Sequence, residues 1–110
     1  MSSGNAERPN ARWTFLTNHA HVLVCIARDP GVRLRDVAQR VGITERATQG
    51  IVGDLVDAGY VTRTRVGRRN QYSVRPDLPL RHPLEHDQVV GQLLEVVSPA
   101  TRRRARKSAT

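Results

Sequence analysis

Residues 34–74 read LRDVAQRVGITERATQGIVGDLVDAGYVTRTRVGRRNQYSV, and this stretch decides the fold. Its first apolar positions repeat with helical spacing up to Gly42, a residue that can take the left-handed conformation that closes a helix. Thr44 follows as a good N-cap, so a second helix is expected from Thr44 to Ala58. The apolar face of that helix is expected at Ala47, Thr48, Ile51, Val52 and Leu55, with Ala47, Ile51 and Leu55 facing inward. The pattern therefore predicts two helices that meet at a tight turn.

Valine, threonine and tyrosine are frequent in the rest of this stretch, at residues 60–66 and 71–75. β-Branched and aromatic residues favour strands. The four residues between them, Gly67-Arg68-Arg69-Asn70, favour a turn. The sequence therefore predicts a basic β-hairpin directly after the second helix.

The flanking sequence adds a helix on each side and a short strand. Residues 16–27 have helical spacing, and Asp29-Pro30-Gly31 is a stop signal. At residues 32–35 apolar and basic residues alternate, which suits one edge of a small sheet. A last helix is expected to begin at His82-Pro83, because Pro is favoured at the first helical position. Its apolar stripe comprises Leu84, Val90, Leu93, Leu94 and Val97.

The composition favours a single basic domain. The chain has 110 residues and a formal net charge of +8, and this length suits one core. Residues 63–75 and 102–110 each carry +5, which favours a polyanionic partner. No apolar run approaches the roughly 20 residues that span a bilayer, and the first ten residues lack an apolar signal segment. We therefore expect a cytoplasmic protein without membrane contact.

The central stretch resembles winged helix-turn-helix bacterial regulators of the MarR and ArsR kind. Four groups carry the resemblance: Leu-x-x-Val-Ala at 34–38, Val-Gly-Ile-Thr at 41–44, the exit from Leu55 through Gly59-Tyr60-Val61, and Gly-Arg-Arg-Asn at 67–70. The resemblance implies a mainly α fold with a small β-hairpin, that is, a winged helix-turn-helix with a C-terminal dimerisation helix. It also implies a transcriptional regulator that binds double-stranded DNA.

These implications divide the chain into three parts. Residues 13–98 are expected to form the winged helix-turn-helix domain, 1–12 a flexible N-terminal segment and 99–110 a basic disordered tail. Within the domain, the resemblance assigns residues 44–58 as the recognition helix in the major groove. It assigns residues 61–75 as the wing on the DNA backbone or minor groove.

The outward face of the second helix has the chemistry to read DNA. Gln49 can bond an adenine edge in a bidentate manner, and Arg46 can bond guanine or a phosphate. Gly50 and Gly53 let the backbone approach closely, although each destabilises the helix by about 1 kcal/mol relative to Ala. The basic hairpin suits phosphates or an AT-rich minor groove. The candidate DNA-binding residues are Thr44, Glu45, Arg46, Gln49, Gly50, Gly53, Arg63, Arg65, Arg68, Arg69 and Asn70.

The apolar face of the last helix either packs on its own domain or pairs with a second chain. We favour pairing, because a two-fold dimer can span DNA half-sites about 34 Å apart and so increase specificity. Trp13 and Phe15 are further candidates for this surface. The expected homodimer interface comprises Leu16, Leu84, Val90, Leu93, Leu94 and Val97.

Three other functions are alternatives to DNA binding. One alternative is a winged helix that binds protein or RNA. Another is a metal-responsive, ArsR-like sensor, for which Cys25 and the histidines, including His82 and His86 at i, i+4, are the available ligands. No second cysteine accompanies them, so no metal site is assigned, and Cys25 is expected to be a small core residue or a redox switch. The third, an enzyme, is rejected because no nucleophile–base pair, phosphate loop or carboxylate pair is present, and no cofactor is expected.

Overall fold

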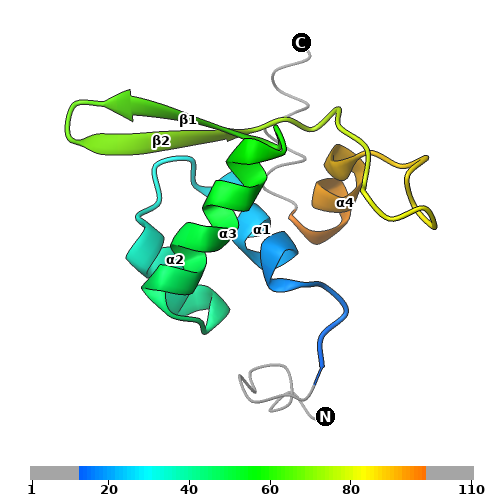
Figure 1. The fold of residues 1–110 in the computed structure, drawn as a ribbon, viewed down its shortest axis with the longest axis horizontal. Coiled ribbons are helices and arrows are strands. Elements are labelled where there is room, and N and C mark those ends of the chain that lie inside the picture. The colour runs from blue at the N-terminus through cyan, green and yellow to red at the C-terminus, as the bar shows by residue number, and fades with distance from the viewer. Residues whose placement is uncertain (1–12, 99–110) are drawn as a thin grey trace.

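The computed structural model describes residues 13–98, so the expected flexible segment 1–12 and basic tail 99–110 lie outside the described residues. Helices α1–α3 cluster together, the β-hairpin extends away from them, and α4 lies on the side opposite the hairpin tip (Figure 1). This arrangement is the mainly α fold with one hairpin that the sequence predicts. The elements in chain order are α1 (Asn18–Arg28), α2 (Leu34–Val41), α3 (Glu45–Asp57), β1 (Val61–Val66), β2 (Arg69–Val74) and α4 (Val90–Val97).

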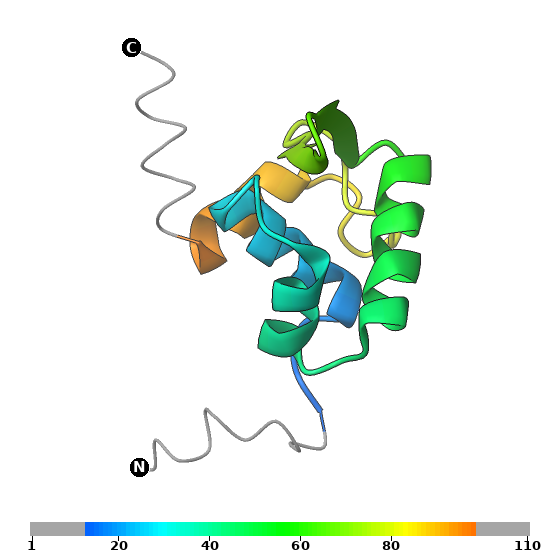
Figure 2. The same cartoon turned by 90° about the vertical axis from the view of Figure 1, so that its left-hand side faces the viewer.

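Helix α1 is the centre of the fold. Thr17 caps its start, because the Thr17 Oγ1 accepts a hydrogen bond from the Ala20 N–H at 3.2 Å. The helix contacts α2, α3, β2 and α4, and Figure 2 shows it between α3 and α4. Val22 and Ile26 are therefore fully buried. The core around them comprises Val22, Leu23, Ile26, Ala27, Val32, Val37, Ile51, Val52, Leu55, Val61, Tyr72, Val90 and Leu94.

The turn between α2 and α3 is fixed by backbone hydrogen bonds and a cap. Gly42 ends α2 with a φ of +89°, a left-handed conformation that favours glycine. The N–H groups of Gly42 and Ile43 both donate to the Ala38 carbonyl, at 2.8 and 3.0 Å. The Thr44 Oγ1 then accepts a hydrogen bond from the Ala47 N–H at 3.0 Å. The predicted helix end and N-cap are both confirmed.

The inward face of α3 differs from the prediction at one position. Thr48, Ile51, Val52 and Leu55 are buried as expected for this face, but Ala47 is exposed. The expectation that Ala47 faces the core is therefore wrong. Thr48 can be buried because its hydroxyl donates to the Thr44 carbonyl at 3.0 Å, which leaves no unpaired donor in the core.

The two strands form an antiparallel hairpin whose register runs from Val61–Val74 to Val66–Arg69. Arg69, expected in the turn, therefore belongs to β2 together with Asn70. Val61 and Tyr72 are buried, whereas Val66 near the tip is exposed. Only the base of the hairpin is covered by the helices, and its tip projects from them.

No strand forms at residues 32–35, contrary to the prediction. Val32 is buried in the core, and Leu34 already begins α2. One backbone hydrogen bond joins the preceding loop to the hairpin, from the Tyr72 N–H to the Pro30 carbonyl at 2.9 Å. The alternation at 32–35 therefore comes from two apolar residues that pack inward at a helix start.

The last helix is shorter than predicted, because it begins at Val90 rather than at His82. Two backbone hydrogen bonds of 2.9 Å pair the segments before it, from the Leu80 N–H to the Gln88 carbonyl and from the Val90 N–H to the Leu78 carbonyl. This antiparallel pairing closes residues 81–88 into bends and turns and leaves Val89, the residue before α4, extended. A helix therefore cannot form across this segment.

The start of α4 packs closely against Pro76. The Gly91 N–H donates to the Pro76 carbonyl at 2.9 Å. A Cβ at position 91 would lie 2.9 Å from the Pro76 Cβ and 3.0 Å from the Pro76 carbonyl oxygen. Any side chain at this position would therefore push α4 away from the segment that leaves the hairpin.

We expect Gly91→Ala to lower the free energy of unfolding by about 1–3 kcal/mol, because the steric overlap outweighs the higher helix propensity of Ala. Gly50→Ala is the matched control, since a Cβ at position 50 meets nothing within 4 Å. It should raise the free energy of unfolding by about 1 kcal/mol. Denaturant unfolding of the three chains measures both effects, and equal stabilities of the two variants would contradict the packing argument.

Candidate nucleic-acid interface

The outer face of α3 is free of bulky side chains along part of its length. Gln49 and Gly50 are exposed, and Gly53 is half-buried. A Cβ at either glycine would meet nothing within 4 Å. Ala47, which the sequence predicted to face the core, adds a small exposed side chain to this face. The α3 backbone is therefore accessible to a partner over roughly two turns.

The N-terminal end of α3 combines three exposed polar residues, Thr44, Glu45 and Arg46. The Thr44 oxygen accepts the capping hydrogen bond, and its hydroxyl proton can still donate outward. Glu45 suits the positive end of the helix dipole. Arg46 makes no hydrogen bond or ion pair with any residue from 13 to 98. Its guanidinium is therefore available to an external acceptor.

Two arginines of the wing, residues 61–74, also support the local structure. Arg65 donates from Nε to the Gly67 carbonyl at 3.2 Å, which braces the hairpin turn. Arg69 donates from Nη2 to the Gly31 carbonyl at 2.5 Å, which joins β2 to the loop before α2. Each guanidinium keeps further N–H donors, so these bonds leave both arginines able to bind another acceptor.

The other wing candidates are more open. Arg63 and Arg68 are exposed and form no hydrogen bond or ion pair within the described part of the chain. Asn70 is half-buried beside them on β2. Uncompensated positive charge on a projecting element favours an anionic partner.

Arg33 belongs with these residues, and sequence reasoning missed it. It is exposed and immediately precedes α2, and it lines a cleft with Arg68 and Arg69. The hydrogen bonds from Tyr72 to Pro30 and from Arg69 to Gly31 bring this residue next to the wing. A contact between segments about 40 residues apart leaves no local signal in the sequence.

The residues expected at a dimer interface fall into different environments. Val90 and Leu94 are 4% and 2% exposed and pack in the core of their own chain. Leu16, Leu93 and Val97 are half-buried, and Leu84 lies in the turns before α4 with 87% of its surface exposed. Val96, which was not among the candidates, is the large apolar residue that α4 exposes, at 79%.

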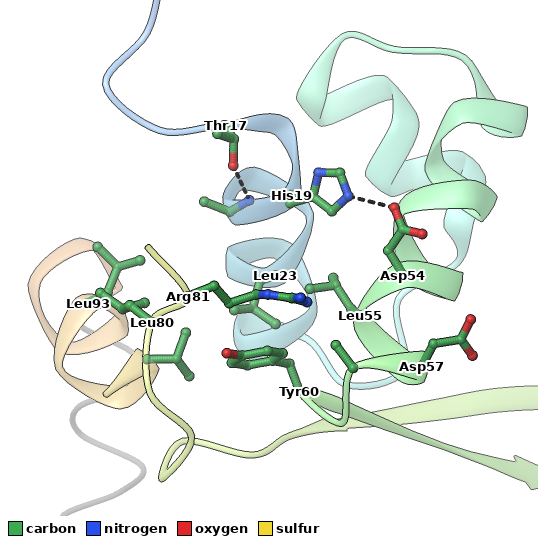
Figure 3. Close-up of a pocket in the computed structure, with 13 residues that line it drawn as sticks. Thr17, His19, Leu23, Asp54, Leu55, Asp57, Tyr60, Leu80, Arg81 and Leu93 are labelled. Carbon is green, nitrogen blue, oxygen red and sulfur yellow. Dashed lines mark hydrogen bonds and ion pairs between the residues drawn. The ribbon is translucent and has the colours of Figure 1, made fainter. Parts of the chain in front are cut away.

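A separate cavity of about 650 Å³ lies between α1, the C-terminal end of α3 and α4. Its walls are largely apolar and include Leu23, Leu55 and Leu93. Figure 3 shows the Arg81 side chain reaching into it, while the Asp57 carboxylate points away. Arg81 has no ion-pair partner among residues 13–98. The cavity can therefore hold a small molecule with an apolar body and a negative group.

An ion pair at the rim of this cavity joins α1 to α3. His19 Nε2 lies 2.8 Å from Asp54 Oδ2 (Figure 3). Both side chains are largely exposed, so the pair adds little to stability. It links the two helices at the mouth of the cavity.

Cys25 has the character of a packing residue. Its side chain is half-buried against the core. Burial raises the pKa of the Cys25 thiol, and the nearby Arg40 and Arg28 offset part of that rise. A thiol with a raised pKa holds little thiolate at neutral pH and reacts slowly.

Residues 13–98 contain neither a metal-binding cluster nor a membrane-spanning helix. No three His, Cys, Asp or Glu side chains come together there in a way that could hold a metal ion. His82 and His86, expected on one helix face, lie in turns instead. None of the helices in this part of the chain has the length and apolar character needed to cross a membrane.

Three helices with a tight glycine turn, followed by a projecting hairpin, define a winged helix-turn-helix protein. The model of the MarR family matches residues 14–69, just over half of the chain. The chain therefore belongs to the MarR family. A comparison with curated protein sequences finds no match.

Solved structures of two other proteins are similar to this chain. One is the Mycobacterium tuberculosis MarR family protein Rv2887 in complex with p-aminosalicylic acid. It has 21% sequence identity to this chain and a TM-score of 0.51, and the match covers 86% of this chain and 65% of that one. The structure of Rv2887 in complex with salicylic acid has 22% sequence identity and a TM-score of 0.50, and the match covers 81% of this chain and 62% of that one. The other is the PcaV transcriptional regulator of Streptomyces coelicolor in complex with its natural ligand. It has 25% sequence identity and a TM-score of 0.48, and the match covers 55% of this chain and 45% of that one. The chain thus spans less than two thirds of each of these proteins, and the likeness concerns the fold.

Proposed function

We propose that the chain is a sequence-specific transcriptional regulator that binds double-stranded DNA through α3 and the wing. The observation that carries the proposal is a bare, exposed face on α3 beside a wing in which Arg63, Arg65, Arg68 and Arg69 have no carboxylate partner among the described residues; Arg75, at the end of the wing, pairs with Asp77. The major groove, about 12 Å wide, admits an α-helix. The flanking phosphates would neutralise the wing.

In this proposal α3 lies in the major groove with Gln49 and Arg46 toward the base edges. An amide reads adenine in a bidentate manner, and a guanidinium reads guanine. Gly50 and Gly53 permit a closer approach than a helix with side chains at these positions would allow. Ala47 can contact a thymine methyl group. The wing then lies on the backbone or in the adjacent minor groove.

A protein-binding or RNA-binding winged helix is the competing function. A protein partner gives no reason for a bare helix face and a wing with unpaired positive charge to occur together. Double-stranded RNA has a deep, narrow major groove that a helix cannot enter. Both features therefore favour duplex DNA.

We expect the affinity for random-sequence duplex DNA to fall steeply with salt, and the double variant Arg63→Ala, Arg65→Ala to flatten the slope of log affinity against log salt by about two. The physical reason is that each lost phosphate contact releases about one counterion fewer. Fluorescence anisotropy over a salt series measures the slope. The control is Thr62→Ala, Thr64→Ala, which changes the alternate positions of β1 without altering charge.

The outcomes of this titration separate the hypotheses. A slope that is the same in both double variants removes the wing from the interface. Absence of duplex binding by the wild-type chain, even at low salt, means that the DNA proposal fails. Binding to single-stranded RNA under the same conditions would then favour the RNA-binding alternative.

We also infer that the regulator acts as a homodimer. Trp13, Phe15 and Val96 are 69%, 91% and 79% exposed, and large exposed apolar side chains are typical of interaction surfaces. The Trp13 and Phe15 rings pack edge to face, with centroids 4.9 Å apart. The half-buried Leu16, Leu93 and Val97 remain candidates for the same interface.

If α4 forms part of the dimer interface, Val96→Glu should lower the association constant by about tenfold or more, because it places a charge in a desolvated contact. Val66→Glu is the matched control, since it introduces the same charge at an exposed valine on the wing. Sedimentation equilibrium over a range of concentrations measures the association constant. Identical behaviour of the two variants would exclude α4 from the interface.

The cavity between α1, α3 and α4 supports a second activity, the binding of a small organic acid. Its walls are largely apolar, and Arg81 supplies a cation without a partner among the described residues. Because residues at the C-terminal end of α3 line the cavity, an occupant would contact the DNA-reading helix directly. Salicylic acid, the molecule in one of the Rv2887 complexes, is a suitable probe.

At a concentration ten times its dissociation constant, salicylic acid should raise the free energy of unfolding by about 1.4 kcal/mol. Arg81→Ala should remove most of this gain, and Arg40→Ala, an exposed arginine outside the cavity, should keep it. Thermal unfolding with and without the acid provides the measurement. An equal gain in all three chains would place the bound acid elsewhere.

A further inference from the structure

A second cleft, of about 350 Å³, lies where the start of α2 meets the wing. Its polar wall is made by Arg33, Arg68, Arg69 and Asn70. The residues that support it, Val32 and Tyr72, are buried in the core. The cleft is therefore built on the rigid part of the domain, although its arginines come from segments far apart in the chain.

The charge in this cleft is uncompensated. None of its three arginines forms an ion pair with a residue from 13 to 98. Of the acids nearest Arg33 in sequence, Asp29 uses its Oδ1 to accept from the Gly31 N–H at 3.2 Å, and Asp36, in the first turn of α2, forms no ion pair with any of the three arginines. Three guanidinium groups that share one cleft repel each other, and this cost falls when an anion occupies the space between them.

The two walls of the cleft are held in register before any ligand binds. Arg69 Nη2 donates to the Gly31 carbonyl at 2.5 Å, and the Tyr72 N–H donates to the Pro30 carbonyl at 2.9 Å. Both bonds join β2 to the loop that leads into α2. A binding site that is already assembled loses less conformational entropy when it takes up a ligand.

We propose that this cleft binds one phosphodiester group of the DNA backbone, with Arg33 and Arg68 contacting it from the two walls. The proposal rests on the proposed DNA binding and adds Arg33, outside the recognition helix and the wing, to the interface. Guanidinium groups match the tetrahedral phosphate oxygens with paired N–H donors. The contact fixes the angle between the wing and the helix-turn-helix on the duplex, because one phosphate is held by both.

The test compares Arg33→Ala with Arg35→Ala in the full chain, both titrated against the same random-sequence duplex. Arg35 is an equally charged, exposed residue two positions away on α2, and it does not line the cleft. Arg33→Ala should weaken binding about tenfold and flatten the salt slope by about one. Arg35→Ala should weaken binding no more than about twofold, the effect of distant screened charge. Circular dichroism melting verifies that both variants are folded.

A second arm uses inorganic phosphate and the free protein. Phosphate should shift the backbone amide NMR signals of Leu34 and Asn70 in the wild type and in Arg35→Ala, and the shifts should be lost in Arg33→Ala. Shifts that are the same in all three chains would mean that phosphate does not occupy the cleft. This arm does not depend on DNA binding.

The two arms distinguish failure of this inference from failure of the proposed function. If the wild type binds duplex DNA and Arg33→Ala behaves like Arg35→Ala, the cleft proposal is overturned and DNA binding stands. If the wild type does not bind duplex DNA, the proposed DNA binding is overturned, and so is the proposal that the cleft holds a phosphate of the DNA backbone. Phosphate-induced shifts in that case would identify a site for a free anion instead.

Discussion

Burial of the apolar face of α1 is the constraint on which the other elements depend. Four elements pack against this helix, and its Val22 and Ile26 are fully enclosed. Aromatic residues make up only 4% of the chain, so the core relies on close packing of small branched side chains. Neither α2 nor α3 is long enough to be stable in isolation. The orientation of the outer face of α3 and of the wing therefore follows from how these helices fit onto α1.

Features that depend on neighbours in sequence could be predicted, and features that depend on distant contacts could not. Gly42 and Thr44 specify the turn locally, through a left-handed residue and a side-chain cap. The start of α4 depends instead on pairing between Leu80 and Gln88, and Pro83 alone gave a misleading helix signal. The same limit applies to residues 32–35, where inward packing at a helix start imitates the alternation of a strand.

In the candidate site, too, local features could be predicted from the sequence, and features that depend on distant contacts could not. The arginines of the wing and the glycines of α3 stand out in the sequence because of their composition and position. Ala47 was misplaced because it lies at the edge of the face that Thr48, Ile51, Val52 and Leu55 form, and helical spacing does not show how far such a face is covered. Arg33 was missed because the hydrogen bonds that bring it to the wing join residues 38 and 42 positions apart, Arg69 to Gly31 and Tyr72 to Pro30.

The two glycines of α3 also bear on how this protein can evolve. They interrupt a helix of 13 residues, so its helicity depends on the burial of Ile51, Val52 and Leu55 on the other side. The solvent face of α3 thus contributes almost nothing to folding. Substitutions on this face can change the surface that the helix presents without loss of the fold, because the face proposed to read DNA and the face that packs in the core lie on opposite sides of one helix.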